Sequence, residues 1–297
     1  MKVLGIETSC DDTGIAVYDV YKELASREHT KKIVFLLDKV FQKINVAKEI
    51  DLIAYTAGPG LVGSLLVGAT FACSLGFSLN IPVLPVNHME AHLLSPMLEC
   101  KSIEFPFIAL LVSGKHTQII AVYNLGKYEI LGNSLDDAAG EAFDKVSKML
   151  GLKYPNGREL SNLASKGIKD YFYFPRPMIN HSNLNFSLKT FVSNIIKNNV
   201  LNMQKKANIA RAFEDAKGWK RLVIAGGVSA NIVLRKKSKD MMKKTFNGKV
   251  FYSSLKFCTD NGAMIAYLGS LRYKEACTTL LEILVKPKWS IDDLSYF

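Results

Sequence analysis

Residues 3–19 read VLGIETSCDDTGIAVYD, and residues 107–124 read FIALLVSGKHTQIIAVYN. Each stretch has an apolar run, a short polar turn and a second apolar run, which is the pattern of two β-strands joined by a turn. The spacing agrees as well, because Thr8 and Ser113 each stand eight positions before an Ala-Val-Tyr segment. We therefore predict an α/β chain with an internal repeat, in which the same strand-turn-strand unit appears twice.

Outward from these two units, the sequence alternates between strand and helix patterns. The further expected strands are 52–57, 82–86, 128–134, 221–225 and 250–253, and the expected helices are 29–44, 60 onward, 137–152, 206–216, 234–244 and 261–272. The second copy continues through the strand 128–134 before its helix, whereas the first passes from Asp19 almost directly to a helix. We therefore expect the first half to lack one strand.

The domain boundary is expected between 95 and 105, where a new block with the character of a buried strand begins. Residues 1–100 would form the first half and residues 101–260 the second. The chain would then return to the first half through a C-terminal helix near 261–285.

Composition places the chain among globular proteins with a large core. It has 297 residues, 48% of them hydrophobic and 22% charged, and Gly (20) and Pro (9) are too few for a disordered or collagen-like chain. Lys and Arg number 38 against 27 Asp and Glu, and this net charge of +11 favours a polyanionic partner such as nucleic acid or a nucleotide. Only seven of the cations are Arg, so a compositional drift towards Lys is the alternative explanation.

Cysteine usage indicates a reduced, cytoplasmic protein, since five scattered cysteines without a CxxC pair suggest neither a disulfide framework nor a thiolate zinc site. The N-terminus alternates like a strand and has no signal-peptide pattern. Residues 61–79 are long and apolar enough to span a membrane. Gly and Ser interrupt this stretch and no Lys or Arg flanks it closely, so a buried core helix is the prediction.

His88 and His92 stand four positions apart, which on a helix places both imidazoles on one face and within reach of one metal ion. A metallopeptidase motif has its general base directly after the first His. Here Glu90 comes two positions later and would project about 200° away from His88, so the peptidase mechanism lacks its base. A His pair without metal remains the alternative. Asp260, at a strand-to-helix junction, is the candidate third ligand.

Residues 58–63 match GxGxxG between a strand and a helix, which raises a dinucleotide-binding interpretation. That interpretation requires an acidic residue about 20 positions on, and residues 81–87 contain none. The segment is therefore expected to form a tight turn with close helix packing.

Two further turns, 111–117 and 225–231, each follow a buried strand and carry small residues. Backbone N–H groups in such turns, with Ser and Asn side chains, can bind phosphate or ribose. We expect these turns to lie on opposite halves and to form a nucleotide cleft between two lobes, as in actin, sugar kinases and Hsp70.

In their order along the chain, these motifs resemble the TsaD family of bacterial tRNA threonylcarbamoyladenosine transferases, once described as sialoglycoprotein endopeptidases. The matching segments are 5–13, 57–63, 88–92, 113–117, 136–144, 225–231 and 257–261, and the similarity covers nearly the whole chain.

The resemblance implies a two-lobed actin-like α/β fold, a duplicated RNase H-like arrangement. It implies transfer of the threonylcarbamoyl group from threonylcarbamoyl-AMP to N6 of the adenosine 3′ to the anticodon, in tRNAs that read codons beginning with A. His88, His92 and Asp260 would hold one metal ion, Fe²⁺ or alternatively Zn²⁺. The substrate would be bound by Leu111, Val112, Ser113, Gly114, Lys115, Asp144, Gly157 and Asn231. The implied partners are tRNA, TsaB and TsaE, in the cytoplasm and without a membrane.

The chain also departs from the family pattern. Lys115 stands where the family has a second Gly, and Asn156 likewise replaces a Gly. The family's third strand between Tyr18 and Leu24, an insert near 185–189 and most of a helix near 216–219 are not found in the sequence. A catalytically weakened ATP-binding scaffold is therefore the alternative function, and a metallopeptidase is a more distant one.

Overall fold

The computed structural model describes residues 1–9, 13–19, 22–27, 33–149, 160, 184–185, 221–275 and 283–294. The predicted helix 206–216, the turn around Gly157 and the segments 186–189 and 216–219 lie outside these residues. The chain divides into two compact units, Met1–Glu99 with Leu255–Phe297 (unit 1) and Cys100–Ser254 (unit 2). The C-terminal segment therefore belongs with the N-terminal one, although all of unit 2 separates them in sequence.

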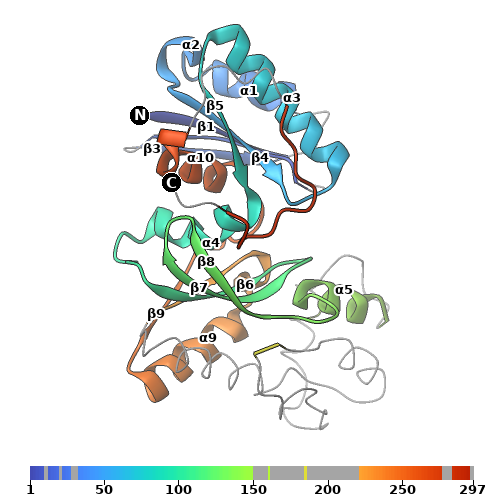
Figure 1. Ribbon diagram of the computed structural model, residues 1–297, viewed down its shortest axis with the longest axis vertical. Helices are drawn as coiled ribbons and strands as arrows, with labels where there is room; N and C mark the ends of the chain where they lie inside the picture. Colours follow the sequence, from blue (N-terminus) through green and yellow to red (C-terminus); the bar gives the residue numbers. More distant parts are fainter. Residues whose placement is uncertain are drawn as a thin grey trace. The chain divides into compact units, whose positions relative to one another are not determined.

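Unit 1 is built on a mixed five-stranded sheet with the order β3-β2-β1-β4-β5 (Figure 1). Its strands are β1 (Lys2–Glu7), β2 (Gly14–Asp19), β3 (Lys22–Arg27), β4 (Leu52–Gly58) and β5 (Val83–Asn87). The first three are antiparallel neighbours, and β4 and β5 continue the sheet in parallel with β1. The carboxyl ends of β1, β4 and β5 therefore meet at one edge of the sheet.

The expectation that the first half lacks a strand is wrong. Residues Lys22–Arg27 form β3, which pairs with all of β2 from Gly14 to Asp19. The sequence of this strand, KELASR, is half charged and has no apolar run. An edge strand tolerates such a composition, because charged residues there discourage pairing with other chains.

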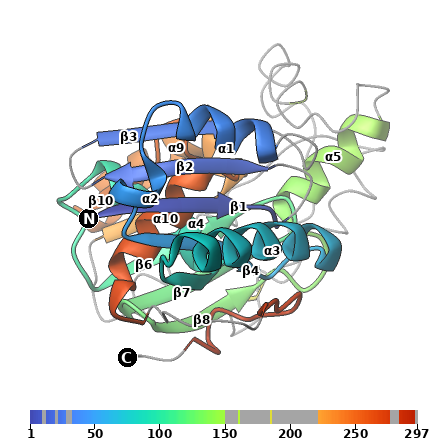
Figure 2. The same cartoon turned by 90° about the horizontal axis from the view of Figure 1, so that it is seen from above.

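The two faces of the unit 1 sheet carry different helices, and the alternation of side chains along β1 separates them. Leu4 and Ile6 lie in the core with α1 (Ile33–Phe41), α2 (Val46–Glu49) and α3 (Val62–Leu79). Gly5 instead faces α10 (Gly262–Leu271), which Figure 2 shows on the side of the strands away from α1 and α3.

Helix α10 lies unusually close to the sheet because glycines meet at the contact. A Cβ atom on Gly5 would be 2.3 Å from the carbonyl oxygen of Gly262, and one on Gly262 would be 2.5 Å from the amide nitrogen of Ala16. Neither separation is possible for a real side chain. The glycines thus fix where α10 begins, and with it the position of Asp260 just before that helix.

Helix α3 is the one helix among the described residues that is long and apolar enough to cross a membrane by length and composition. Leu65, Ala69 and Ala72 on one side of it are buried, with Ala69 and Ala72 in the unit 1 core, while Leu66 and Phe77 are exposed. This packing supports the predicted core helix.

A C-terminal strap, residues 283–294, runs along β4 and β5 (Figure 1). The amide of Lys286 donates to the carbonyl of Ala57 (2.6 Å), and the hydroxyl of Tyr55 donates to the carbonyl of Leu284 (3.0 Å). The amide of Gly60 donates to the carbonyl of Pro287 (3.1 Å). The strap therefore covers the turn that follows β4.

Unit 2 repeats the same sheet topology with the order β10-β9-β6-β7-β8. Its strands are β6 (Phe107–Val112), β7 (Thr117–Asn124), β8 (Lys127–Asn133), β9 (Arg221–Ala225) and β10 (Lys249–Tyr252). Again three antiparallel strands are followed by two parallel ones. The internal repeat predicted from residues 3–19 and 107–124 is thus confirmed at the level of the sheets.

The described helices of unit 2 flank this sheet and share its core. They are α5 (Ala139–Met149), the short 3₁₀ turn η2 (Gly227–Ala230), α9 (Ile232–Met241) and the π-helical turn η3 (Met242–Phe246). The predicted helix 234–244 corresponds to α9 and η3. Lys236, Lys239, Lys243 and Lys244 are exposed on it, so this helix presents basic side chains to solvent.

Candidate functional site

The two histidines lie at the start of α4 (His88–Glu99), as their spacing predicts. Helix α4 begins directly after β5 because Asn87 caps it: the side-chain oxygen of Asn87 accepts hydrogen bonds from the amides of Met89 (2.8 Å) and Glu90 (3.1 Å). His88 and His92 are both buried, and their rings meet edge to face with centroids 4.6 Å apart. The helix thus presents both imidazoles on one face.

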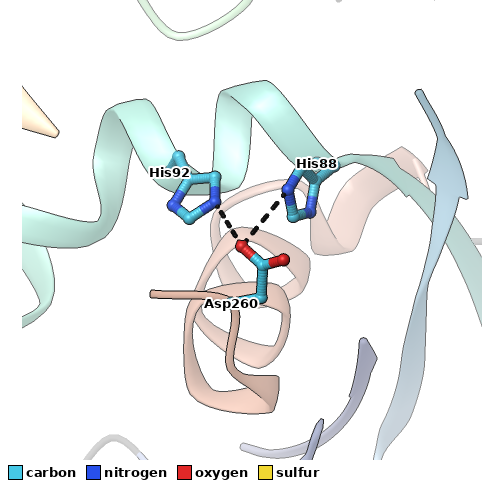
Figure 3. A group of neighbouring side chains, drawn as sticks. All are labelled: His88, His92 and Asp260. Atoms are coloured by element: carbon cyan, nitrogen blue, oxygen red, sulfur yellow. Dashed lines mark hydrogen bonds and ion pairs between the residues drawn. The ribbon is translucent and has the colours of Figure 1, made fainter. Parts of the chain in front are cut away.

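Asp260 reaches these histidines from the other end of the sequence (Figure 3). It precedes Asn261, whose side-chain oxygen caps α10 by accepting from the amide of Met264 (3.0 Å). The Asn261 side-chain amide in turn donates to the carbonyls of Phe257 and Thr259, which shapes the loop that carries Asp260. Two capped helix starts therefore bring the three predicted ligands together.

The donor atoms of His88, His92 and Asp260 lie within 4.8 Å of one another. Asp260 Oδ1 is 2.9 Å from His92 Nε2 and 3.6 Å from His88 Nε2. Ligand atoms held about 2.1 Å from one ion stand about 3 Å apart when they are adjacent, so these separations suit a single transition-metal ion. Two imidazole nitrogens and one carboxylate oxygen are also a donor set that iron and zinc accept.

Behind His88 lies a buried carboxylate. Glu7 Oε2 is 3.0 Å from His88 Nδ1, and the same oxygen accepts from the Thr56 hydroxyl at 2.5 Å. The other oxygen accepts from the amide of Ser9 at 2.7 Å. Burial alone would raise the pKa of Glu7, but the charge and hydrogen bond of His88 outweigh it and hold that pKa below its usual value.

Glu90 points away from the histidines, as predicted. Its carboxylate forms a buried pair with the Arg272 guanidinium, with separations of 2.7 and 2.9 Å, and Arg272 also binds Glu275. This pair joins α4 to the end of α10. Glu90 is therefore engaged in packing and is not placed as the general base of a peptidase.

The GxGxxG segment forms the expected tight turn between β4 and α3. The amide of Gly60 is bound by the strap, and the amide of Leu61 donates to the carbonyl of Ser9 at 2.8 Å. These amides point at protein carbonyls, so they are not free to hold a pyrophosphate as the dinucleotide interpretation would require.

In unit 2 five of the predicted substrate residues, those from Leu111 to Lys115, lie at the carboxyl end of β6 and in the turn that follows it. The side chains of Leu111 and Val112 are buried in the sheet, so only their backbone could meet a ligand. Ser113 is half-buried, and Gly114 and Lys115 are exposed. The start of α5 adjoins this turn, because the amide of Gly140 donates to the Ser113 carbonyl and the amide of Glu141 to that of Gly114, both at 3.2 Å.

The second turn lies beside the first, which corrects the expectation that the two lie on opposite halves. Strand β9 pairs in parallel with β6, so the turns that follow them leave the same edge of one sheet. Gly226 has a positive φ of 88°, and a Cβ there would be 2.5 Å from the carbonyl oxygen of Val112. Ser113 and Asn231 therefore both belong to unit 2.

The remaining predicted residues are placed as follows. The side chain of Asn231 caps α9 by accepting from the amides of Val233 (2.9 Å) and Leu234 (3.0 Å). Asp144 lies on α5 and is partly buried. Gly157 lies outside the part of the chain that the structure describes.

Glu7, Thr56 and Arg272 were not identified as site residues from the sequence. Glu7 did carry a signal, because a lone acid at the end of the apolar strand VLGI is either exposed or paired inside the protein. No comparable signal exists for Arg272, whose partner Glu90 is 182 positions away.

Comparison with known proteins identifies the family. Residues 18–267 match the TsaD family, described as tRNA N6-adenosine threonylcarbamoyltransferase. The chain belongs to the TsaD family. TsaD membership makes it a tRNA-modifying transferase, in agreement with the resemblance seen in its motifs.

Curated relatives of this TsaD chain are very similar. The protein of Buchnera aphidicola subsp. Schizaphis graminum (strain Sg) is 76% identical over 336 positions, and that of subsp. Acyrthosiphon pisum (strain APS) is 67% identical over the same length. Each match covers 100% of both chains, and both relatives are named tRNA N6-adenosine threonylcarbamoyltransferase.

Solved structures support the actin-like α/β fold of the TsaD chain. HypF of T. kodakarensis has a TM-score of 0.63 at 15% identity, covering 92% of this chain and 47% of that one. A putative N-acetylmannosamine kinase of Listeria monocytogenes has a TM-score of 0.52 at 13% identity, covering 93% and 99%. At these identities the likeness concerns the fold alone.

Proposed function

We propose that this TsaD chain transfers the threonylcarbamoyl group of threonylcarbamoyl-AMP to N6 of the adenosine 3′ to the anticodon, in tRNAs that read codons beginning with A. In this reaction N6 forms a bond to the carbamoyl carbon, the bond from that carbon to the AMP phosphate oxygen breaks, AMP leaves and N6 loses one proton. The observation that carries the proposal is the convergence of His88, His92 and Asp260 in a member of this family.

The ion that we propose for this triad is Fe²⁺, one per chain, with Zn²⁺ as the alternative. When bound, it would supply Lewis-acid chemistry. The residues themselves orient the site: the Asn87 and Asn261 caps fix the two ligand-bearing segments. The helix starts at His88 and Gly262 also favour negative charge nearby, which suits the carboxylate of Asp260 and an anionic substrate.

For the donor substrate we propose binding by the turn 111–115 together with Asp144, Gly157 and Asn231. The support is that two turns and the start of α5 adjoin at one edge of the unit 2 sheet, where Gly114 and Lys115 are exposed. Lys115 adds a cation next to this turn. Such a group can pair with the adenylate phosphate, in place of the closest backbone approach that a second Gly would allow.

TsaB and TsaE are the proposed protein partners, and the cytoplasm without a membrane the proposed location. Exposed apolar side chains on the outer faces of α1 and α3, which share one side of the unit 1 sheet, support a partner protein there. They are Val34, Phe35 and Phe41 on α1, and Val62, Leu66 and Phe77 on α3. The proposal of TsaE rests on the family resemblance.

The experiment is nucleoside mass spectrometry of an unmodified tRNA transcript incubated with the protein, TsaB, TsaE and threonylcarbamoyl-AMP. We expect N6-threonylcarbamoyladenosine at one position of the transcript. Asn231→Ser, which keeps an oxygen at the start of α9, should reduce product formation at least tenfold while tRNA binding stays within about twofold of wild type. Wild-type protein that binds ATP or donor but forms no product would favour the scaffold alternative. Cleavage of a protein substrate without tRNA modification would favour the peptidase.

A further inference from the structure

Glu7 lies beside the metal candidates because of the strand geometry. Gly5 faces α10, so Glu7, two residues further along β1, points to the same face of the sheet. The parallel register of β1 with β4 places Thr56 next to it. His88 follows β5, the next strand in the sheet, whose carboxyl end lies at the same edge. A fully buried acid thus stands behind the first predicted ligand.

Each oxygen of the Glu7 carboxylate accepts a hydrogen bond from a group that acts as the donor in that contact. Oε1 accepts from the backbone amide of Ser9 at 2.7 Å, and Oε2 accepts from the Thr56 hydroxyl at 2.5 Å. A carboxylate engaged in this way acts as an acceptor. In the 3.0 Å contact between Glu7 Oε2 and His88 Nδ1, the hydrogen therefore belongs to His88 Nδ1.

This assignment fixes which nitrogen of His88 can bind a metal. With the hydrogen on Nδ1, the lone pair of a neutral imidazole is on Nε2. Nε2 is the nitrogen that faces Asp260 Oδ1, at 3.6 Å. The Ser9 hydroxyl, 3.2 Å from Nδ1, lies on the same side of the ring as Glu7.

His92 has no equivalent support. Its Nε2 faces Asp260 Oδ1 at 2.9 Å, but its Nδ1 is buried and no described residue hydrogen-bonds to it. Hydrogen-bonded partners of metal-binding histidines orient the ring and raise its basicity. Of the two histidines, His88 is thus the one whose orientation is set in advance by a carboxylate.

We infer that Glu7 is a positioning residue of the metal centre, which holds the proton of His88 on Nδ1 and keeps Nε2 directed at the ion. The inference deepens the proposed function, on which it rests, by naming a residue outside the ligand set that determines metal affinity. It predicts that Glu7 raises metal affinity through the direction of its hydrogen bond with His88, in addition to its contribution to packing.

The substitution Glu7→Gln tests the direction of the hydrogen bond with His88, because the Ser9 amide determines how the glutamine side-chain amide is oriented. The backbone amide of Ser9 can only donate, so the glutamine oxygen must take the position of Oε1. The glutamine NH₂ group then faces His88 Nδ1 and donates to it. This moves the histidine proton to Nε2, where it blocks the metal.

Zn²⁺ affinity of the full chain, measured by calorimetric titration, is the first readout. We expect Glu7→Gln to lower the Zn²⁺ affinity 10- to 100-fold, the range typical when a hydrogen-bond partner of a metal-binding histidine is replaced. Glu90→Gln is the matched control, because Glu90 is also a buried acid near His88 but binds Arg272. The Zn²⁺ affinity of Glu90→Gln should stay within about threefold of wild type, while its thermal stability falls. Equal losses in the two variants would mean that general destabilisation explains the effect and would overturn the inference.

Histidine ¹⁵N NMR of the Zn²⁺-loaded wild type is the second readout and does not depend on any variant folding. We expect His88 to carry its hydrogen on Nδ1 and to bind through Nε2. Binding through Nδ1, or unchanged Zn²⁺ affinity in folded Glu7→Gln, would refute the role of Glu7 and leave the metal centre standing. A wild type that binds neither Zn²⁺ nor Fe²⁺ would instead refute the metal centre itself.

Discussion

Asn231 has two roles at once, since it is a candidate ligand of the adenylate and its side chain caps α9. Asn231→Ala removes both. We expect this variant to lose about 1 kcal/mol of unfolding free energy, the usual cost of losing an N-cap. Asn231→Ser should lose less than half of that, because its hydroxyl oxygen still accepts from the first turn of the helix. Urea unfolding of both variants measures the difference, and equal losses would show that the cap is unimportant.

Single residues were predictable where their spacing carries geometry. A helix is enough to place His88 and His92, four positions apart, on one face. The rotation of about 100° per residue along that helix also predicted that Glu90 points away from them. Asp260 was identified from its place at a strand-to-helix junction and the family resemblance. The role of Glu7 was missed, because the hydrogen bond that it forms with His88 spans 81 positions and depends on the strand register.

At the scale of elements, the close contact of α10 with the sheet is what places Asp260. We expect Gly262→Ala to cost at least about 2 kcal/mol of unfolding free energy, because its methyl group would overlap the backbone of Ala16 and push the helix outward. Metal binding should weaken as well, since Asp260 precedes this helix. Thermal unfolding and metal content together measure both effects.

Gly63→Ala is the control for this prediction. Gly63 lies in the first turn of α3, and a Cβ atom there meets nothing within 4 Å. Alanine is the better helix former by about 1 kcal/mol, so this variant should be as stable as wild type or more stable. A Gly262→Ala variant that behaves like Gly63→Ala would contradict the proposed packing constraint.

Strands were predictable from the sequence where they form a strong apolar run, and were missed where charged residues interrupt that pattern. The buried strands β4, β6 and β9 fall almost where their apolar runs predict. Strand β3 was missed because its pattern is polar and its pairing with β2 defines it. An edge strand pairs with the sheet on one side only and need not be apolar on both faces, so its sequence is a weak indicator of its structure.

On the scale of the whole molecule, duplication was visible in the sequence, but the grouping of the turns 111–117 and 225–231, the candidate substrate-binding turns, was not. Strands β6 and β9 are neighbours although more than 100 residues separate them, and no local pattern reports such a pairing. The alignment with the 76% identical relative spans 336 positions against 297 residues here, so 39 of its positions carry no residue of this chain.

The most direct test of the account is a single-turnover transfer assay that compares wild type with Asp260→Ala, with metal content measured on the same samples. Asp260 is the most exposed of the three candidate ligands, so its replacement should leave the fold and tRNA binding intact. We predict that wild type carries one metal ion and forms N6-threonylcarbamoyladenosine in tRNA, and that Asp260→Ala loses the ion and at least 100-fold of the rate. Transfer by a folded Asp260→Ala protein at the wild-type rate would contradict the account.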